Sequence, residues 1–446
     1  MSCFNADLLH SRWPLRGFSA VHNFPPKIRD VVANHVPIQD RDPAYYLHHA
    51  KHGEPRPDHR SEVRQESDLA IASTPGPSRA RIELLDPLRA VAVLAVLFYH
   101  YAFRGAAADG FTGFSLPEFA AFAKYGFFGV QLFFIISGFV IAYSAEGRTA
   151  SQFAIARITR IYPGFLFCMT VTFAITLAIG APRFEVTLGQ WLANLTMVAP
   201  ALKQPFMDGA YWSIVYEITF YGWVFMLMSL GRFRRNIDHI VLFWIVISIV
   251  NETLLQSGFL RRLLLTDQSG FFCAGLVLYE IHCGRRDRAV MLMLALASLA
   301  AINQALIGAV WDRQYYQVDL DNLVIVGITL ALVAAVALAV RVRRLPFSPD
   351  VIIAIGGVTY PLYLLHQNIG YMLLNKFADQ FAPALLITLL MLTMILGSYL
   401  VWRFFERPAQ KWTKGILIRG LEFLVSAQLR LLASTTTRRR PGTSVS

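Results

Sequence analysis

The sequence predicts an all-α polytopic membrane protein with about ten transmembrane helices and both termini in the cytoplasm. Of its 446 residues, only 16% are charged and 55% are hydrophobic. Soluble domains average about 25% charged residues, so this chain is too poor in charge to cover a soluble globule of its size. From residue 87 onward the apolar residues gather in segments as long as membrane-spanning helices.

Apolar segments of roughly 17–25 residues are the length that crosses a bilayer. Such segments lie at 87–103, 125–144, 158–180, 211–230, 238–256, 266–283, 289–309, 321–340, 350–374 and 382–404. If the N-terminus is cytoplasmic, Lys and Arg are about three times as dense in the inside loops as in the outside loops, which favours this orientation. The net charge of +12 is then explained by cytoplasmic loops, and no nucleic-acid partner is expected.

The chain divides into three regions. Residues 1–81 are polar and rich in histidine, and we expect a disordered N-terminal extension. A metal-binding tract is the alternative there, but the histidine spacings match no ligand pattern, and the four cysteines of the chain are scattered, so no metal is expected. Residues 82–412 form the membrane domain. Residues 413–446 form an amphipathic and disordered tail with a surface helix at 415–433.

The first span carries the sharpest functional signal. Asp86 can be its N-cap and Pro87 its first helical residue. Arg89 then sits one turn inside, at the cytoplasmic end, and His100 follows eleven residues later. Eleven residues return to within roughly 20° of the same helix face, about 16 Å along the axis. One stripe therefore holds a cation near the cytoplasm and an imidazole deep in the membrane. The structural alternative is a buried histidine and a snorkelling arginine.

Two other spans carry ionisable side chains in their outer halves, where such groups are costly and mark function. Glu217 lies within about two turns of the outer end of its span, a depth compatible with His100. A carboxylate beside an imidazole orients its tautomer and raises its basicity. His366 is a second intramembrane histidine.

Arg157 and Arg160 are three residues apart, so they share one face of a helical turn at the cytoplasmic surface. Anionic lipid and a phosphorylated donor are the two ligands that this pair suggests.

Three further features have ordinary structural interpretations. The Ser137-Gly138 pair allows close helix packing. Glu406 and Arg407 are interpreted as an exposed structural ion pair at the end of the last span. His239 lies at a cytoplasmic span end and is interpreted as interfacial.

Taken together, these segments resemble the acyltransferase 3 family, the bacterial integral-membrane acyltransferases that O-acylate envelope and secreted glycans. The resemblance covers about residues 82–412. It rests on six pieces in order: Arg89 and His100 within LDPLRAVAVLAVLFYH, GVQLFFIISGFVI at 129–141, FAIARITRIYP at 153–163, YWSIVYEITFY at 211–221, GGVTYPLYLLH at 356–366 and RFFERP at 403–408. Gln131 departs from the family, which usually has an acidic residue there.

The resemblance implies transfer of an acyl group, acetyl by default, from acyl-CoA to a hydroxyl of a glycan or lipid-linked sugar at the bacterial inner membrane. On this hypothesis His100 is the general base and Glu217 orients it. The CoA headgroup stays on the cytoplasmic side, where the candidate ligands are three arginines: Arg89, Arg157 and Arg160.

The candidates for binding the acceptor are weaker: His366, Tyr363 and Ser213. A covalent acyl-histidine intermediate stays open as a variant.

Two rival functions remain. A proton-coupled transporter or flippase also uses intramembrane Glu and His, but the chain shows no repeated halves or paired broken helices. A membrane-bound O-acyltransferase of the other large class also uses a membrane histidine, but lacks the Arg–His pair of the first span.

Overall fold

The structure is a computed structural model that describes residues 82–107, 110–113, 116–342 and 345–437. Throughout these residues the chain forms helices and loops without a β-strand, which confirms the predicted all-α class. The N-terminal extension predicted at 1–81 and the last nine residues of the tail lie outside the described part.

The helices, in chain order, are α-helical (α), with short π-helical or 3₁₀ stretches (η). They are α2 (Leu85–Tyr99), η3 (His100–Arg104), α3 (Gly105–Ala107), α4 (Pro117–Ala123), α5 (Phe128–Ala145), α6 (Ala150–Ile179), α7 (Leu188–Asn194), η4 (Ala199–Leu202), η5 (Gly209–Tyr211), α8 (Trp212–Ser229), α9 (Ile237–Val250), η6 (Asn251–Leu255), α10 (Gly258–Leu264), α11 (Ser269–His282), α12 (Arg288–Tyr316), α13 (Asn322–Ala339), α14 (Pro349–Phe377), α15 (Pro383–Leu400), η7 (Val401–Glu406) and α16 (Arg407–Thr437).

Every segment predicted to span the membrane overlaps one or two consecutive helices of this series. In the described part, seven helices are long and apolar enough to cross a membrane: those at 85–107, 117–145, 150–179, 237–255, 288–316, 322–339 and 383–424. The predicted spans on α8, α11 and α14 do not meet this measure. With 14 residues, α11 is only about 21 Å long. The total of ten spans and the side of the termini stay predictions.

Two predicted helix ends are wrong. Asp86 is not the N-cap of the first span, because α2 already begins at Leu85 and Asp86 lies in its first turn. The third span was expected from residue 158, but α6 begins at Ala150. There Thr149 and Gln152 form a capping box, each side chain bonding the other's backbone N–H.

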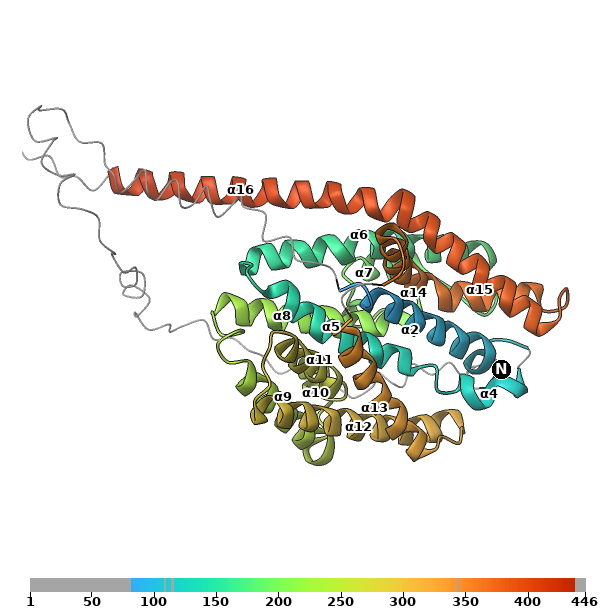
Figure 1. Ribbon diagram of the computed structural model, residues 1–446. Coiled ribbons are helices and arrows are strands. Elements are labelled where there is room, and N and C mark those ends of the chain that lie inside the picture. Colours follow the sequence, from blue (N-terminus) through green and yellow to red (C-terminus); the bar gives the residue numbers. More distant parts are fainter. Residues whose placement is uncertain (1–81, 108–109, 114–115, 343–344, 438–446) are drawn as a thin grey trace, which may run out of the picture. The chain divides into compact units, whose positions relative to one another are not determined.

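The central helices pack closely through small residues. Gly138 of α5 lies against the backbone of α11, where an added Cβ would come within 2.2 Å of the Phe272 carbonyl oxygen. Gly275 of α11 meets α5 in the same way. This confirms the packing interpretation of the Ser-Gly pair. Around them, α14 packs against both α2 and α6, and Figure 1 shows α9, α12 and α13 gathered beside α11.

A buried aspartate ties the start of α8 to α14. Asp208 is fully buried, and its carboxylate accepts the backbone N–H of Ala210 at 2.9 Å and of Asn368 at 2.8 Å. Burial raises the pKa of the Asp208 carboxyl to about 7. The link fixes the first turn of α8 beside the middle of α14, which is where the candidate site lies.

Candidate functional site

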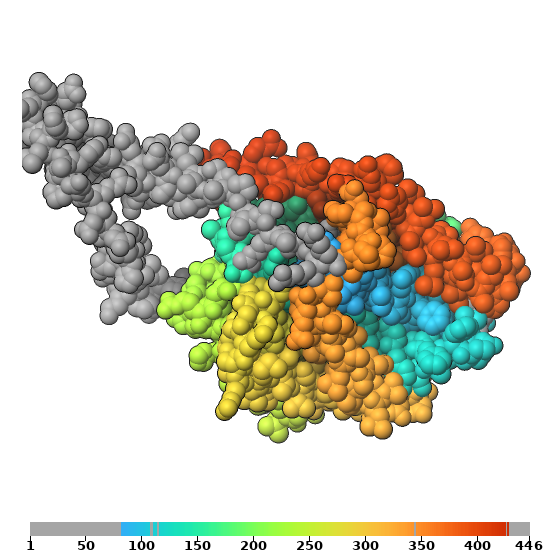
Figure 2. Space-filling model, in the orientation of Figure 1, coloured from blue at the N-terminus to red at the C-terminus, as the bar shows by residue number. Residues whose placement is uncertain are grey.

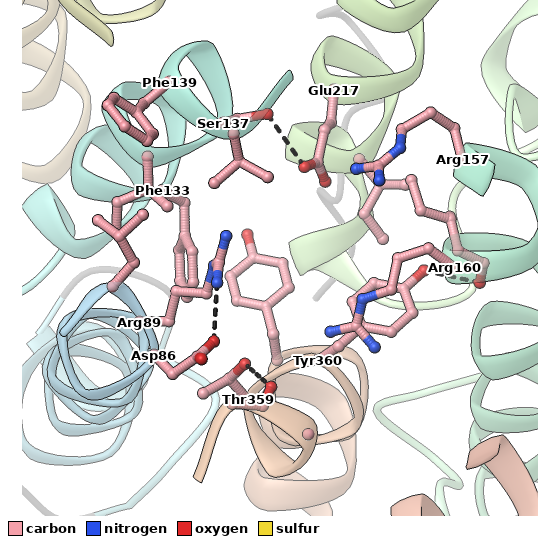
Figure 3. A pocket seen from close by; sticks show the side chains of 18 of the residues that line it. Asp86, Arg89, Phe133, Ser137, Phe139, Arg157, Arg160, Glu217, Thr359 and Tyr360 are labelled. Carbon is pink, nitrogen blue, oxygen red and sulfur yellow. Dashed lines mark hydrogen bonds and ion pairs between the residues drawn. The ribbon is translucent and has the colours of Figure 1, made fainter. Parts of the chain in front are cut away.

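A cavity of about 530 Å³ lies between α2, α5, α6, α8, α14 and the start of α16. It collects residues far apart in the sequence, among them all three arginines proposed to hold the donor. Figure 3 shows the guanidinium groups of Arg89, Arg157 and Arg160 pointing into the same hollow from different sides. The predicted grouping of these three residues is therefore found in the structure.

Two of the three arginines already have carboxylate partners. Arg89 pairs with Asp86 across one turn of α2 at 2.9 Å. Arg160 pairs with Glu406 at 2.7 Å. The interpretation of Glu406 as part of an exposed pair with Arg407 is therefore wrong: Glu406 is fully buried and its partner comes from α6. The reason is the unbroken helix from α15 through η7 to α16, which turns Glu406 inward.

Arg157 differs from the other two arginines. Its guanidinium lies over the rings of Phe153 and Tyr221, at 6.0 and 5.9 Å from their centroids. Within the described residues it forms no ion pair of 4.0 Å or less, and its Nε is buried without a hydrogen-bond partner. A buried donor without a partner is costly. Within the described residues, Arg157 therefore brings to the cavity a guanidinium whose Nε is free to bind an anionic ligand.

Glu217 and His100 are not brought together. Glu217 lines the cavity, and its Oε1 accepts hydrogen bonds from Ser137, at 3.2 Å, and from Tyr221. Its predicted role as the orienting group of His100 has no support in this geometry. A similar predicted depth in the membrane is not enough for contact, because the helix face on which each residue lies decides which side chains meet. Glu217 faces α5 and the cavity, as Figure 3 shows for its contact with Ser137.

The partner of His100 is a tyrosine that the sequence analysis missed. His100 begins the π-helical stretch η3 and is 4% exposed. Its Nδ1 lies 2.7 Å from the Tyr371 hydroxyl. Such π-helical turns are frequent at functional sites. In the sequence nothing marks Tyr371, because it lies outside the quoted motifs and is one of 17 tyrosines.

The second histidine lies against the first. The ring centroids of His100 and His366 are 5.0 Å apart, and His366 is fully buried. Nδ1 of His366 lies 2.7 Å from the Tyr363 backbone carbonyl. Because a carbonyl only accepts, this nitrogen carries the proton of the neutral ring. Nε2 is then a lone-pair acceptor, and within the described residues it has no partner.

Ser213 and Tyr363 connect the cavity with the histidine pair. Both line the cavity, and their hydroxyl groups are 2.6 Å apart. The Tyr363 ring contacts the His366 ring at a centroid distance of 5.4 Å. Neither histidine lines the cavity itself. His100 is thus separated from the arginine-lined space by two ring contacts, Tyr363 to His366 and His366 to His100.

The arrangement combines a cationic cavity with a buried imidazole pair beyond it. A family model described as an acyltransferase domain matches residues 82–403. No curated protein and no solved structure matches the chain. The match covers most of the membrane part, including Arg89, Arg157, Arg160, Glu217 and both histidines, whereas Glu406 and Arg407 lie just beyond it. The chain belongs to the acyltransferase 3 family and is a membrane acyltransferase.

Proposed function

We propose that the protein transfers an acyl group, acetyl by default, from acyl-CoA to a hydroxyl group of a cell-envelope glycan or lipid-linked sugar. The supporting observation is the cationic cavity joined through Tyr363 to the buried His100–His366 pair. The arginine-lined cavity can bind a polyanionic donor, and the buried histidine pair can transfer a proton.

The donor binds through its phosphates. Among the described residues Arg157 has no carboxylate partner, so a phosphate group supplies the acceptor that its guanidinium lacks there. Arg89 and Arg160 line the same space while paired with Asp86 and Glu406. Arg89 and His100 are separated by about 16 Å of helix rise, which an extended pantetheine arm can follow toward the histidines. Entry of the thioester requires the Ser213–Tyr363 contact to open.

His100 acts as the general base. This role requires the tautomer in which Nδ1–H donates to the Tyr371 oxygen, 2.7 Å away, and Nε2 takes the proton. Nε2 removes the proton of the acceptor hydroxyl while that oxygen forms a bond to the thioester carbonyl carbon. The carbon–sulfur bond then breaks, and the leaving thiolate receives the proton from the imidazolium. Such a base contributes typically about 10²–10⁴-fold to the rate.

His366 binds the acceptor. Its Nε2 lone pair is buried and without a partner in the described part, so a sugar hydroxyl that donates to it satisfies both groups.

Glu217 takes a different role from the one first expected. Its carboxylate is held by Ser137 and by Tyr221, whose ring lies beside the Arg157 guanidinium, and it offsets the charge of that cation.

The test is transfer of labelled acetyl from acetyl-CoA into envelope glycan by membranes that carry wild type, His100→Gln or His239→Gln. His239 is exposed and remote in sequence from the motifs, so it serves as the matched control. We expect label with wild type and the control, and a loss of about 10²–10⁴-fold with His100→Gln.

Equal transfer by wild type and His100→Gln would overturn the assignment of the base. Sugar flux across the membrane without covalent modification would overturn the transfer reaction and identify a carrier.

A further inference from the structure

A second cationic hollow adjoins the cavity. It has a volume of about 350 Å³ and is lined by Arg403, Arg407, Pro408 and Lys411. The three cations are spaced four residues apart, so they follow one face of η7 and α16 over about 12 Å. We call Arg403, Arg407 and Lys411 the basic stripe. All three are exposed, and Figure 2 shows the red C-terminal segment that contains them at the surface.

Among the residues that the structure describes, the basic stripe has no acidic partner. None of its members forms an ion pair or a hydrogen bond with another side chain of the described residues. Arg403 and Arg407 lie only over the rings of Phe404 and Trp402, each at 5.9 Å. Three adjacent cations repel one another unless an anion lies between them. The stripe therefore has the charge of a binding site for a group with more than one negative charge.

The basic stripe is also fixed to the wall of the cavity. Arg407 lines both hollows. On the neighbouring face of the same helix, Glu406 pairs with Arg160, and Gln410 donates to Glu406 at 2.7 Å. The stripe thus lies where the arginine-lined cavity meets the surface. The predicted orientation places the basic stripe at the cytoplasmic face of the membrane.

We propose that the basic stripe binds the 3′-phosphate of the CoA nucleotide, while the diphosphate lies deeper, at Arg157. This inference rests on the proposed function, because it takes acyl-CoA as the donor. A phosphomonoester carries close to two negative charges at neutral pH, with a second pKa of about 6. An arginine fork matches its oxygen geometry, and the flanking lysine adds a point charge.

The test measures binding of CoA and of 3′-dephospho-CoA to the full chain in phosphatidylcholine nanodiscs by calorimetry. Wild type should bind CoA about tenfold more tightly, because a hydrogen bond to a charged group contributes roughly 1.5 kcal/mol. The double variant Arg403→Gln/Lys411→Gln should lose this preference and bind both ligands alike. Arg419→Gln, an exposed arginine elsewhere on α16, removes the same type of charge and should keep the preference.

Each other outcome overturns the inference for a distinct reason. If the double variant keeps the wild-type preference, the phosphate binds elsewhere, and the donor assignment stands. If wild type binds neither ligand, acyl-CoA is not the donor and the proposed function fails with it. If only phosphatidylglycerol nanodiscs raise the melting temperature, and the double variant abolishes that rise, the stripe binds a lipid phosphate instead.

Discussion

The hydroxyl of Tyr371 is the hydrogen-bonding group that the structure places on His100, and removing it alone tests how the base is held. Tyr371→Phe keeps the ring and its packing. We expect kcat to fall about tenfold, the effect of one lost hydrogen bond of roughly 1.4 kcal/mol, with KM for the donor unchanged. Steady-state kinetics measures both values. Tyr162→Phe, at an exposed tyrosine, is the matched control, and an unchanged kcat for Tyr371→Phe would contradict the contact's role.

Replacing Arg157 should weaken CoA binding without lowering the thermal stability of the protein. Arg157→Met removes a cation that has no ion pair in the described part of the chain, so the melting temperature should stay the same or rise, whereas the Kd for CoA should increase at least about tenfold. Glu406→Gln is the contrast: it leaves Arg160 without its charged partner and should lower the melting temperature. A thermal melt and a binding titration check both. A lower melting temperature for Arg157→Met would mean that this arginine is structural.

For individual residues, the sequence predicted the positions of charged side chains better than their contacts. The three arginines could be grouped because each lies at a span end, where positive charge and helix periodicity fix its depth. The pairing of Glu217 with His100 could not be judged, because helix rotation decides which face a residue presents. Tyr371 could not be found, since a tyrosine in an apolar span gives no signal until its neighbour is known.

Among the elements, the contact between α5 and α11 is the most sensitive to size. Gly138→Ala places a methyl group within 2.2 Å of the Phe272 carbonyl oxygen, and backbone cannot easily move away. We expect destabilisation of about 1–3 kcal/mol, seen as a lower melting temperature in detergent or nanodiscs. Gly222→Ala on α8 is the control, because nothing lies within 4 Å of its added Cβ. Equal melting of the two variants would refute the close approach.

The lengths of the apolar segments predicted where the helices lie, but they predicted the helix ends less accurately. The segment 382–404 and the surface helix at 415–433 were predicted as separate, but the structure joins them through η7. The intervening Glu406, Arg407 and Lys411 suggest a break in hydropathy. They do not break the backbone, because each is compatible with a helix and Glu406 is satisfied by Arg160.

For the whole molecule, the predicted orientation can be tested with a cysteine that the chain already has. Cys283 is exposed beside a predicted cytoplasmic loop, whereas Cys168 and Cys273 are buried. In a Cys3→Ser background, a membrane-impermeant maleimide should label Cys283 in inverted vesicles and not in intact spheroplasts. Lys203→Cys, in a predicted outside loop and exposed, should show the reverse pattern. Labelling of Cys283 from outside would invert the topology.

The two ring contacts between the cavity and His100 have a consequence for the cell. On the proposed function, donor and acceptor approach from opposite compartments, and packed aromatic rings stand where their paths meet. The thioester end of the donor reaches this point, and only the acyl group is passed on to the acceptor. The coenzyme stays in the cytosolic pool for another round of charging, and the growing polymer outside never draws on that pool directly. Packed rings leave little room for water or ions, so on the proposed function an outer glycan is modified without a continuous aqueous path across the membrane.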